Sequence, residues 1–305
     1  MHVTPILTFY FPDQLRKRAR AGRHNFINKI KSVVEPSGFE VKFENRNKHN
    51  LIKSASQPGY AMFLMDDPFH DRALTMRKVY EHPFWAIENT SKRWGWVVAK
   101  TAFPVDQVKR EEADRFYRFW RKRQFGDMAE KATRQGFVYI PLQGKLLEHR
   151  SFQACSPLCM IEHVLKQDAT RSIVVGLHPG ETYTVEEMFE LERLVARYPR
   201  ISIQMGGMTD LLADCDYIVT QNSSVAFFGY FFSKPSVLFG QIDFHHISAN
   251  VIDLGVEHAM EIGPHLEPDY AGYIHWFWQQ MSINGGRGDA EDKIRARLLS
   301  AGWPI

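Results

Sequence analysis

The sequence is poor in cysteine, in long apolar runs and in net charge, and each shortage excludes a class of protein. Three cysteines among 305 residues are too few for a disulfide framework, and they indicate reduced thiols in a cytoplasm. No run of about 18 apolar residues occurs, so we expect no membrane-spanning helix. The formal charge of +3 gives no reason to expect nucleic acid as a partner.

Targeting and nucleotide-binding signatures are also missing. Residues 1–18 have no basic segment ahead of their short apolar part, so we expect no signal peptide. No Gly-x-Gly-x-x-Gly follows a predicted strand and no Walker-type loop occurs, which counts against NAD-dependent enzymes and P-loop kinases. The remaining composition, 44% hydrophobic and 24% charged, is that of an ordinary globular protein, which we expect in the cytoplasm.

The second half of the chain alternates short apolar segments with amphipathic ones. Ser156 followed by Pro157 predicts the start of one helix, and Thr184 with Glu187 forms a capping-box pattern at the start of another. Strands that are apolar on both faces and alternate with helices predict an α/β fold with a parallel, doubly wound sheet. The predicted strands are 137–143, 172–179, 201–206, 217–221 and 236–240.

The first half has the same alternation in a less regular form. Strands are predicted in VTPILTFYF, FEVKFEN, YAMFLMD and FWAIEN, helices at 13–34 and 70–80, and a basic loop at 46–57. The charged, helix-prone stretch 105–133 is a candidate connection between domains. We therefore expect an N-terminal domain, 1–134, that ends in a linker helix. A C-terminal domain, 135–305, would end in two helices separated by NGGRG.

Polar residues follow three of the predicted strands, at the edge where open α/β sheets bind their ligands. His178, Pro179 and Gly180 follow the second strand. Pro179 holds His178 extended, so the imidazole can donate a hydrogen bond to a phosphate or stabilise a departing one. The alternative is a histidine that is satisfied by a neighbouring carbonyl.

Gln221, Asn222, Ser223 and Ser224 separate the fourth strand from an apolar helix. The N–H groups at the start of that helix and the two hydroxyls favour an anion. Ordinary helix capping explains why one of these four residues is polar, and it does not account for the other three.

The loop after the first strand supplies a third group. Gln143 ends the strand, and Lys145, Glu148 and Arg150 follow it. Glu148 is the only carboxylate in this loop, which makes it the candidate general base. A solvated charge paired with Arg150 is the alternative.

An acidic cluster in the first half has the composition of a metal site. The segment MDDPFHD, 65–71, contains Asp66, Asp67, His70 and Asp71. Because Asp followed by Pro is also an ordinary turn, we interpret this segment as a turn and expect no metal.

Two further pairs carry less information. Cys155 and Cys159 have the spacing of half a metal site, but without a second pair nearby we interpret them as core thiols. His245 and His246 follow the fifth strand, and their spacing specifies no role.

The segment 115–125, RFYRFWRKRQF, combines basic and aromatic residues. Phe116, Phe119, Trp120 and Arg123 recur at helical spacing, which is typical of a helix on an anionic membrane surface. The favoured interpretation is a linker helix whose aromatic side chains pack between two domains.

The order of the strand ends resembles a known family. PLQ ends one strand, HP ends the next, Ser-Ser follows a fourth, and KPSVLFG lies beyond it. In residues 137–250 this order is similar to capsular polysaccharide synthesis proteins related to bacterial Kdo transferases. It is more distantly similar to bacterial sialyltransferases with a GT-B fold. The resemblance implies two Rossmann-like domains facing a cleft, the C-terminal one binding a nucleotide-sugar and the N-terminal one lying on the acceptor side.

The resemblance also implies roles for the residues at the strand ends. His178, Ser223 and Ser224 would bind the donor phosphate, and Gln143 would lie near the acceptor or the donor sugar. The family usually has an acidic residue four positions after this glutamine, where this sequence has Leu147. Glu148 stands one position later, and Asp210 and Asp214 are the substitutes.

We expect a cytoplasmic bacterial glycosyltransferase that acts in the synthesis of capsular or surface polysaccharide. If the segment 115–125 lies on a membrane surface, the protein would be peripheral to the inner membrane. It would transfer a Kdo-like or sialic-acid-like sugar, CMP-activated in the favoured case, to a glycan or lipid-linked acceptor. We expect no metal and no cofactor apart from the nucleotide-sugar co-substrate. The alternatives are a nucleotide-sugar epimerase and a non-catalytic nucleotide-sugar-binding homologue.

Overall fold

The computed structural model describes residues 4–305, and the chain forms two compact α/β units. The first unit comprises Met1–Thr101 and Phe277–Ile305, and the second comprises Ala102–Trp276. Each unit has its own six-stranded sheet and its own apolar core. Within residues 4–305, no helix has both the length and the apolar character needed to cross a membrane.

The sheet of the first unit has the strand order β12-β5-β4-β3-β1-β2. The parallel strands are β1 (Ile6–Phe11), β2 (Glu40–Asn45), β3 (Tyr60–Leu64) and β4 (Ala73–Lys78). Two further strands complete the sheet: β5 (Phe84–Glu88) runs antiparallel to β4, and β12 (Ile283–Asn284) runs antiparallel to β5.

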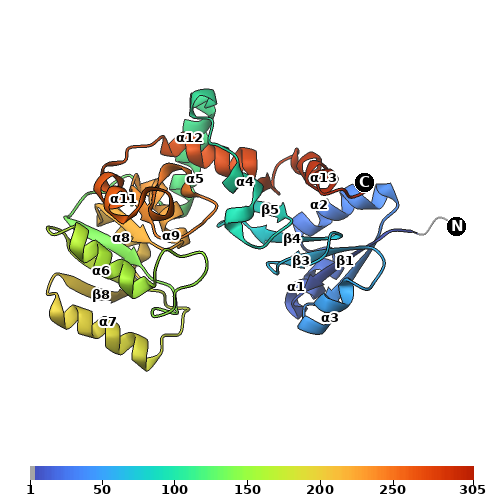
Figure 1. The fold of residues 1–305 in the computed structure, drawn as a ribbon. Coiled ribbons are helices and arrows are strands. Elements are labelled where there is room, and N and C mark those ends of the chain that lie inside the picture. Colours follow the sequence, from blue (N-terminus) through green and yellow to red (C-terminus); the bar gives the residue numbers. More distant parts are fainter. Residues whose placement is uncertain (1–3) are drawn as a thin grey trace. The chain divides into compact units, whose positions relative to one another are not determined.

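Helices cover both faces of this sheet. The core face of β1, with Leu7, Phe9 and Phe11 fully buried, packs on the same cluster as α1 (Asp13–Arg20), α2 (Asn25–Val34) and α13 (Ala290–Ser300). Helix α13 lies beside α2, although the two come from opposite ends of the chain (Figure 1). An ion pair of 2.7 Å between Lys29 and Glu291 joins them. The other face carries α3 (Lys48–Ser54), and α4 (Val97–Lys100) follows β5.

Two local predictions for this unit are wrong. The segment 70–80, expected to be a helix, contains β4, whose first four residues are buried and pair with β3 and β5. Ala, Leu and Met favour helices, so here strand pairing overrides propensity. The expected loop at 46–57 contains α3, capped by Asn47. The helical stretch predicted at 13–34 is confirmed as α1 and α2, which are separated near Gly22, with φ +66°.

The sheet of the second unit is entirely parallel, in the order β11-β10-β9-β6-β7-β8. Its strands are β6 (Phe137–Pro141), β7 (Ser172–Leu177), β8 (Ile201–Met205), β9 (Tyr217–Thr220), β10 (Ser236–Leu238) and β11 (Ala249–Asn250). The five strands expected from the sequence are therefore confirmed, and β11 extends the sheet.

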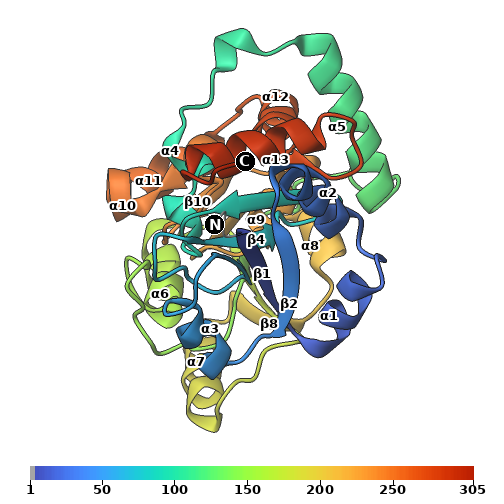
Figure 2. The same ribbon diagram turned by 90° about the vertical axis from the view of Figure 1, so that its right-hand side faces the viewer.

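Helices flank this second sheet on both faces, as in a doubly wound fold. One layer contains α6 (Pro157–Gln167), α7 (Val185–Arg197) and α11 (Val256–Ile262), and the opposite layer contains α8 (Met208–Asp214) and α9 (Ser224–Gly229) (Figure 2). The remaining helices are α5 (Arg110–Phe125), α10 (Val251–Leu254) and α12 (Tyr270–Ile274), the last of which continues into a π-helical turn at His275–Met281. Both predicted helix starts are confirmed. Ser156 Oγ accepts a hydrogen bond from Cys159 N, and Thr184 and Glu187 form the complete capping box.

Helix α5 packs inside the second unit. The Tyr117 hydroxyl donates to the Tyr230 carbonyl at 2.7 Å, and its ring stacks on Phe231. Trp120 is 5% exposed, whereas Phe119 is 54% exposed. The aromatic face of α5 is packed, as the favoured interpretation expects, and the partners of Tyr117 belong to the same unit, so α5 forms part of the second unit.

The two compact units differ from the expected domain boundary at residues 134 and 135. Helix α5 belongs to the second unit because of the contacts described above. The C-terminal helix α13 belongs to the first unit because Ala290, Ile294 and Leu298 are fully buried in that unit's core. The last segment of the chain therefore completes the core that the first segment begins.

Candidate functional site at the carboxyl edge of the second sheet

The loops after β6, β9 and β10 meet at the carboxyl edge of the second sheet, where hydrogen bonds join them. Gln221 Nε2 donates to the Cys155 carbonyl at 3.0 Å, and Gln241 N donates to the Phe152 carbonyl at 2.8 Å. Thr220 Oγ1 donates to the Pro141 carbonyl at 3.0 Å. These contacts hold polar residues from separate loops in one place.

Three predicted residues line one small cavity at this edge. Gln143, Arg150 and Gln221 surround a space of about 10 Å³, which is room for about one water molecule. Gln221 Oε1 and the Nε and Nη2 atoms of Arg150 are buried there without a hydrogen-bond partner. The guanidinium lies 4.9 Å from the centre of the Phe152 ring. This edge therefore offers a cation and an amide whose hydrogen-bonding capacity the protein does not use.

Gln153 positions Arg150, although it was not among the predicted site residues. Its Oε1 accepts a hydrogen bond from Arg150 N at 2.7 Å, and its side chain is almost fully buried. Its position three residues after Arg150 in the same loop is the only sequence signal that points to it.

His178 is exposed at the end of β7, and one of its ring nitrogens is already occupied. His178 Nδ1 accepts a hydrogen bond from Gly180 N at 3.0 Å, and His178 N donates to the Tyr183 hydroxyl at 2.9 Å. A neutral ring in this arrangement carries its proton on Nε2. The imidazole therefore presents an N–H donor to the solvent at the strand end.

The loop after β7 also contacts the loop after β6 through two carboxylates. Glu187 Oε1 accepts from Leu146 N at 2.6 Å, so the capping-box glutamate also anchors the β6 loop. Glu181 lies against Gly144, where a Cβ atom would come within 2.9 Å of Glu181 Oε2. Sequence analysis missed Glu181, although it stands only three residues after His178.

The residues after β9 divide into two kinds. Ser223 is the N-cap of α9 and accepts a hydrogen bond from Val225 N at 3.3 Å, so capping explains this serine. Asn222 is buried, and Ser224 is half-buried at the first position of the helix. Gln221, with its unpartnered Oε1, is the residue that capping does not explain.

Glu148 is not held at the cavity. It forms an ion pair of 2.8 Å with Lys145, and more than half of each side chain is exposed. Its partner is thus Lys145 and not Arg150. Of the two substitutes, Asp210 is exposed in the first turn of α8, after β8. Asp214 ends α8 and accepts from Thr133, which places it at the opposite edge of the sheet.

The acidic segment of the first unit uses its carboxylates in local contacts. Arg46 donates two hydrogen bonds to Asp66, at 2.6 and 2.8 Å, and Asp67 accepts from the Thr90 hydroxyl and from Ser91 N. These contacts agree with the interpretation of the segment as a turn.

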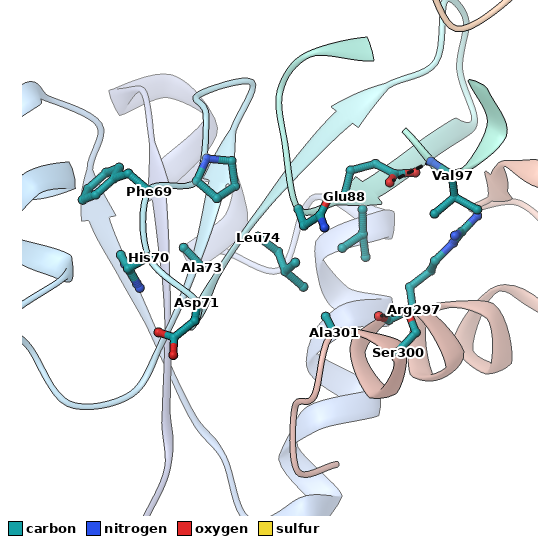
Figure 3. A pocket seen from close by; sticks show the side chains of 13 residues that line it. Phe69, His70, Asp71, Ala73, Leu74, Glu88, Val97, Arg297, Ser300 and Ala301 are labelled. Carbon is teal, nitrogen blue, oxygen red and sulfur yellow. Dashed lines mark hydrogen bonds between the residues drawn. The ribbon is translucent and has the colours of Figure 1, made fainter. Parts of the chain in front are cut away.

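His70 and Asp71 line a separate pocket of about 850 Å³ in the first unit. Figure 3 shows them on one side of this space and Arg297, Ser300 and Ala301 of the C-terminal segment on the other. The pocket lies at the amino end of β4 and the carboxyl end of the antiparallel β5, which is the edge opposite to the one where open α/β sheets bind ligands. It is the larger cavity, but its position does not match the predicted site.

Other predicted residues have structural partners. His245 and His246 stack on each other with ring centres 4.3 Å apart, and their Nδ1 atoms lie 2.9 Å from the Ile242 carbonyl and from the Tyr273 hydroxyl, respectively. Lys234 of the KPSVLFG motif is buried and donates to the carbonyls of Thr133 and Cys215. Burial lowers the pKa of Lys234.

In the structure, His163 lies close to the cysteine pair. Cys155, Cys159 and His163 place one ligand atom each within 4.8 Å of one another. Burial raises the pKa of the Cys155 thiol to about 12, and the neighbouring Cys159 contributes to the rise.

The chain was compared with protein-family models, with curated proteins and with solved structures, and only the solved structures are similar to it. No protein-family model matches the sequence, and the search of curated proteins finds no match. Among solved structures, the chain is similar to KpsC, a beta Kdo 2,7 transferase of Thermosulfurimonas dismutans. The TM-score is 0.58 at 12% identity, over 97% of this chain and 99% of that one. The chain has a GT-B fold. The similarity expected from residues 137–250 is thereby confirmed for the fold, and it extends over the first half as well.

Two further structures resemble the chain with lower scores. The beta Kdo 2,4 transferase KpsC of the same organism gives a TM-score of 0.49 at 12% identity, with 90% of each chain covered. WaaG, a glycosyltransferase involved in lipopolysaccharide biosynthesis, gives 0.38 at 9% identity, over 95% of this chain and 99% of the other.

Proposed function

We propose that this protein is a glycosyltransferase that moves a sugar acid from a nucleotide-activated donor, CMP-activated in the favoured case, to a glycan or lipid-linked acceptor. The observation that carries the proposal is the pair of buried, unpartnered groups at the carboxyl edge of the second sheet, on Arg150 and Gln221. The fold that the chain shares with a Kdo transferase supports it.

Arg150 suits the chemistry of such a donor. A Kdo-like or sialic-acid-like sugar carries a carboxylate, and its CMP group carries one phosphate. A guanidinium with free N–H groups binds either anion with two parallel hydrogen bonds, and partial burial strengthens them. Gln143 and Gln221 line the same cavity, and the one water molecule for which it has room would bridge them to hydroxyl groups of the sugar.

His178 would act on the leaving group. In an inverting transfer, the acceptor oxygen forms a bond to the anomeric carbon while the bond from that carbon to the phosphate oxygen breaks. Negative charge then accumulates on the departing nucleotide. The N–H that His178 Nε2 presents at the end of β7 would stabilise this charge, with the N–H groups at the start of α9 beside Ser224.

The acceptor proton needs a base, and Glu181 has a better position for this role than Glu148. Glu181 lies against Gly144, next to Gln143, whereas Glu148 forms an exposed ion pair with Lys145. We therefore propose Glu181 as the general base and keep Glu148 as the alternative.

Acceptor-dependent nucleotide release tests the function. Purified protein is incubated with a CMP-activated sugar acid, with and without surface glycan fragments, and free CMP is measured. We expect release only when the acceptor is present, together with a lengthened glycan. Release that ignores the acceptor would contradict a transferase.

A non-catalytic donor-binding homologue is the second candidate, because the predicted base Glu148 is held in an exposed ion pair. Under this alternative the protein binds the nucleotide-sugar tightly and never releases free nucleotide with any glycan. The release assay combined with a binding titration separates the two candidates.

A further inference from the structure

Three potential metal ligands converge at the start of α6. Cys155 precedes the N-cap Ser156, Cys159 lies in the first turn of the helix, and His163 lies one turn further. The two Sγ atoms and a ring nitrogen of His163 all lie within 4.8 Å of one another. All three residues are half-buried, so an ion could reach the cluster from solvent.

The convergence follows from helix geometry. Positions four apart share one helix face and are separated by about 6 Å of rise. Helical side chains lean towards the N-terminus, so the longer His163 side chain reaches back towards Cys159. Cys155 lies outside the helix, and its loop turns the thiol towards the same point.

We propose that Cys155, Cys159 and His163 bind a zinc ion. Two sulfur ligands and one imidazole form a set that Zn²⁺ favours, whereas Mg²⁺ and Ca²⁺ prefer oxygen ligands. Three protein ligands leave the fourth tetrahedral position for water. The common iron–sulfur clusters held by four cysteines would need one more cysteine than the three of this chain.

The third cysteine, Cys215, is fully buried and precedes β9, at the other edge of the sheet. It therefore takes no part in the cluster.

A bound ion would have a structural consequence at the carboxyl edge. It would fasten the loop ahead of α6 to the helix through Cys155. Gln221 Nε2 donates to the Cys155 carbonyl at 3.0 Å, so the same ion would stabilise the position of Gln221. The ion touches no group to which we assign a chemical step, so its role is to position this loop.

Cobalt spectroscopy tests the site. Chelator-treated, reduced protein is titrated with Co²⁺. We expect the visible bands of tetrahedral Co²⁺ and a near-ultraviolet thiolate-to-metal charge-transfer band, saturating at one ion per chain and lost when Zn²⁺ is added. Absence of a thiolate band in the wild-type protein would overturn the proposal.

Variants identify the ligands. Cys159→Ser should remove most of the charge-transfer band, and the matched control Cys215→Ser should retain it. His163→Gln, which leaves both thiols in place, should weaken Co²⁺ binding at least tenfold and abolish the rise in melting temperature that Zn²⁺ produces in the wild type. A full band in Cys159→Ser, unchanged affinity in His163→Gln, or loss of the band in Cys215→Ser would each contradict the assignment.

Discussion

At the carboxyl edge, Arg150, Gln153 and Gln221 each have buried hydrogen-bonding atoms without a partner. A buried polar atom without a partner costs about 1–3 kcal/mol, so a folded protein rarely keeps several of them together. Ser223, by contrast, caps a helix, and Glu187 completes a capping box and anchors a loop. At the residue scale, the unsatisfied atoms are therefore a sharper guide to a ligand site than polarity alone.

Arg150→Lys should raise the donor KM by about tenfold while kcat changes less. Lysine keeps the charge but loses the planar fork that binds a carboxylate or phosphate in two places. Steady-state kinetics with a CMP-activated sugar acid would measure this. Arg193→Lys, an exposed change on α7, is the matched control and should leave both constants unaltered. Equal effects of the two substitutions would remove Arg150 from the site.

Glu181→Gln should reduce kcat by about a hundredfold or more with donor affinity retained, because the amide keeps the size of the side chain and loses its basicity. Glu148→Gln should have a much smaller effect, since Glu148 is exposed and paired with Lys145. Single-turnover rates and donor titrations on both variants separate chemistry from binding. The reverse ranking would return the role of general base to Glu148.

At the scale of elements, a buried charge network holds the second sheet together at the edge away from the site. Asp168, which follows α6, accepts hydrogen bonds from the Tyr217 hydroxyl at 2.9 Å and from Arg171 Nη1 at 2.8 Å. Arg171 Nε also donates to Asp216 at 2.7 Å. Burial alone would raise the pKa of Asp168, but the combined hydrogen bonds outweigh it and lower the pKa.

Asp168→Asn should lower the free energy of unfolding by about 2 kcal/mol at neutral pH, since hydrogen bonds to a buried charge are lost. A carboxyl whose pKa is lowered by folding stabilises the protein above the unfolded pKa of about 3.9, and this contribution disappears as the pH falls through the folded value. The difference in melting temperature between wild type and variant should therefore shrink below about pH 4. Asp127→Asn, which breaks an exposed pair with Lys122, should change little at any pH. A constant difference across the pH range would refute the network account.

Helix α5 has a buried aromatic face and an exposed basic face, so substitutions on the two faces should change the stability of the protein by different amounts. Trp120→Ala should destabilise the protein by about 3 kcal/mol because the ring is 5% exposed. Phe119→Ala should be nearly neutral in thermal denaturation because that ring is 54% exposed. Equal losses of melting temperature would contradict the observed orientation of the helix.

We also propose that the exposed face of α5 makes peripheral contact with an anionic membrane. Phe119 and the exposed Arg118 and Lys122 would lie at the lipid surface, where each basic residue contributes about 1 kcal/mol. The triple variant Phe119→Ala, Arg118→Glu, Lys122→Glu should lose binding to phosphatidylserine vesicles without unfolding. Vesicle sedimentation at rising salt measures this. Wild-type protein that remains in the supernatant at low salt would rule out the membrane contact.

At the scale of the whole molecule, the two units differ in how much of their structure can be predicted from their sequences. The second unit follows largely from local signals, because its strands are mostly apolar and the helices α6, α7 and α9 begin at side-chain caps. In the first unit, β4 consists of residues that favour a helix, and only pairing with β3 and β5 makes it a strand. The packing of α13 on α2 joins opposite ends of the chain, and no local pattern predicts it.

The candidate site was predictable to a similar extent. Because parallel strands end at one edge, the strand ends predicted Gln143, Arg150 and Gln221 as neighbours, and the structure places all three at one cavity. The contact of Glu181 with Gly144 depends on how two loops meet, which spacing does not specify. The Cys155–Cys159–His163 cluster has a regular spacing of four, but a search for paired cysteines overlooks a histidine as the third ligand.

Nucleotide binding tests the central claim most directly, because it requires no knowledge of the acceptor. CMP, UDP and GDP are titrated calorimetrically into the wild-type protein, His178→Ala and the control His258→Ala, whose side chain is exposed on α11. We predict that CMP binds, that His178→Ala weakens its binding at least tenfold, and that His258→Ala leaves its affinity unchanged. No binding of any nucleotide, or equal affinity in His178→Ala, would contradict a nucleotide-sugar site at the carboxyl edge of the second sheet.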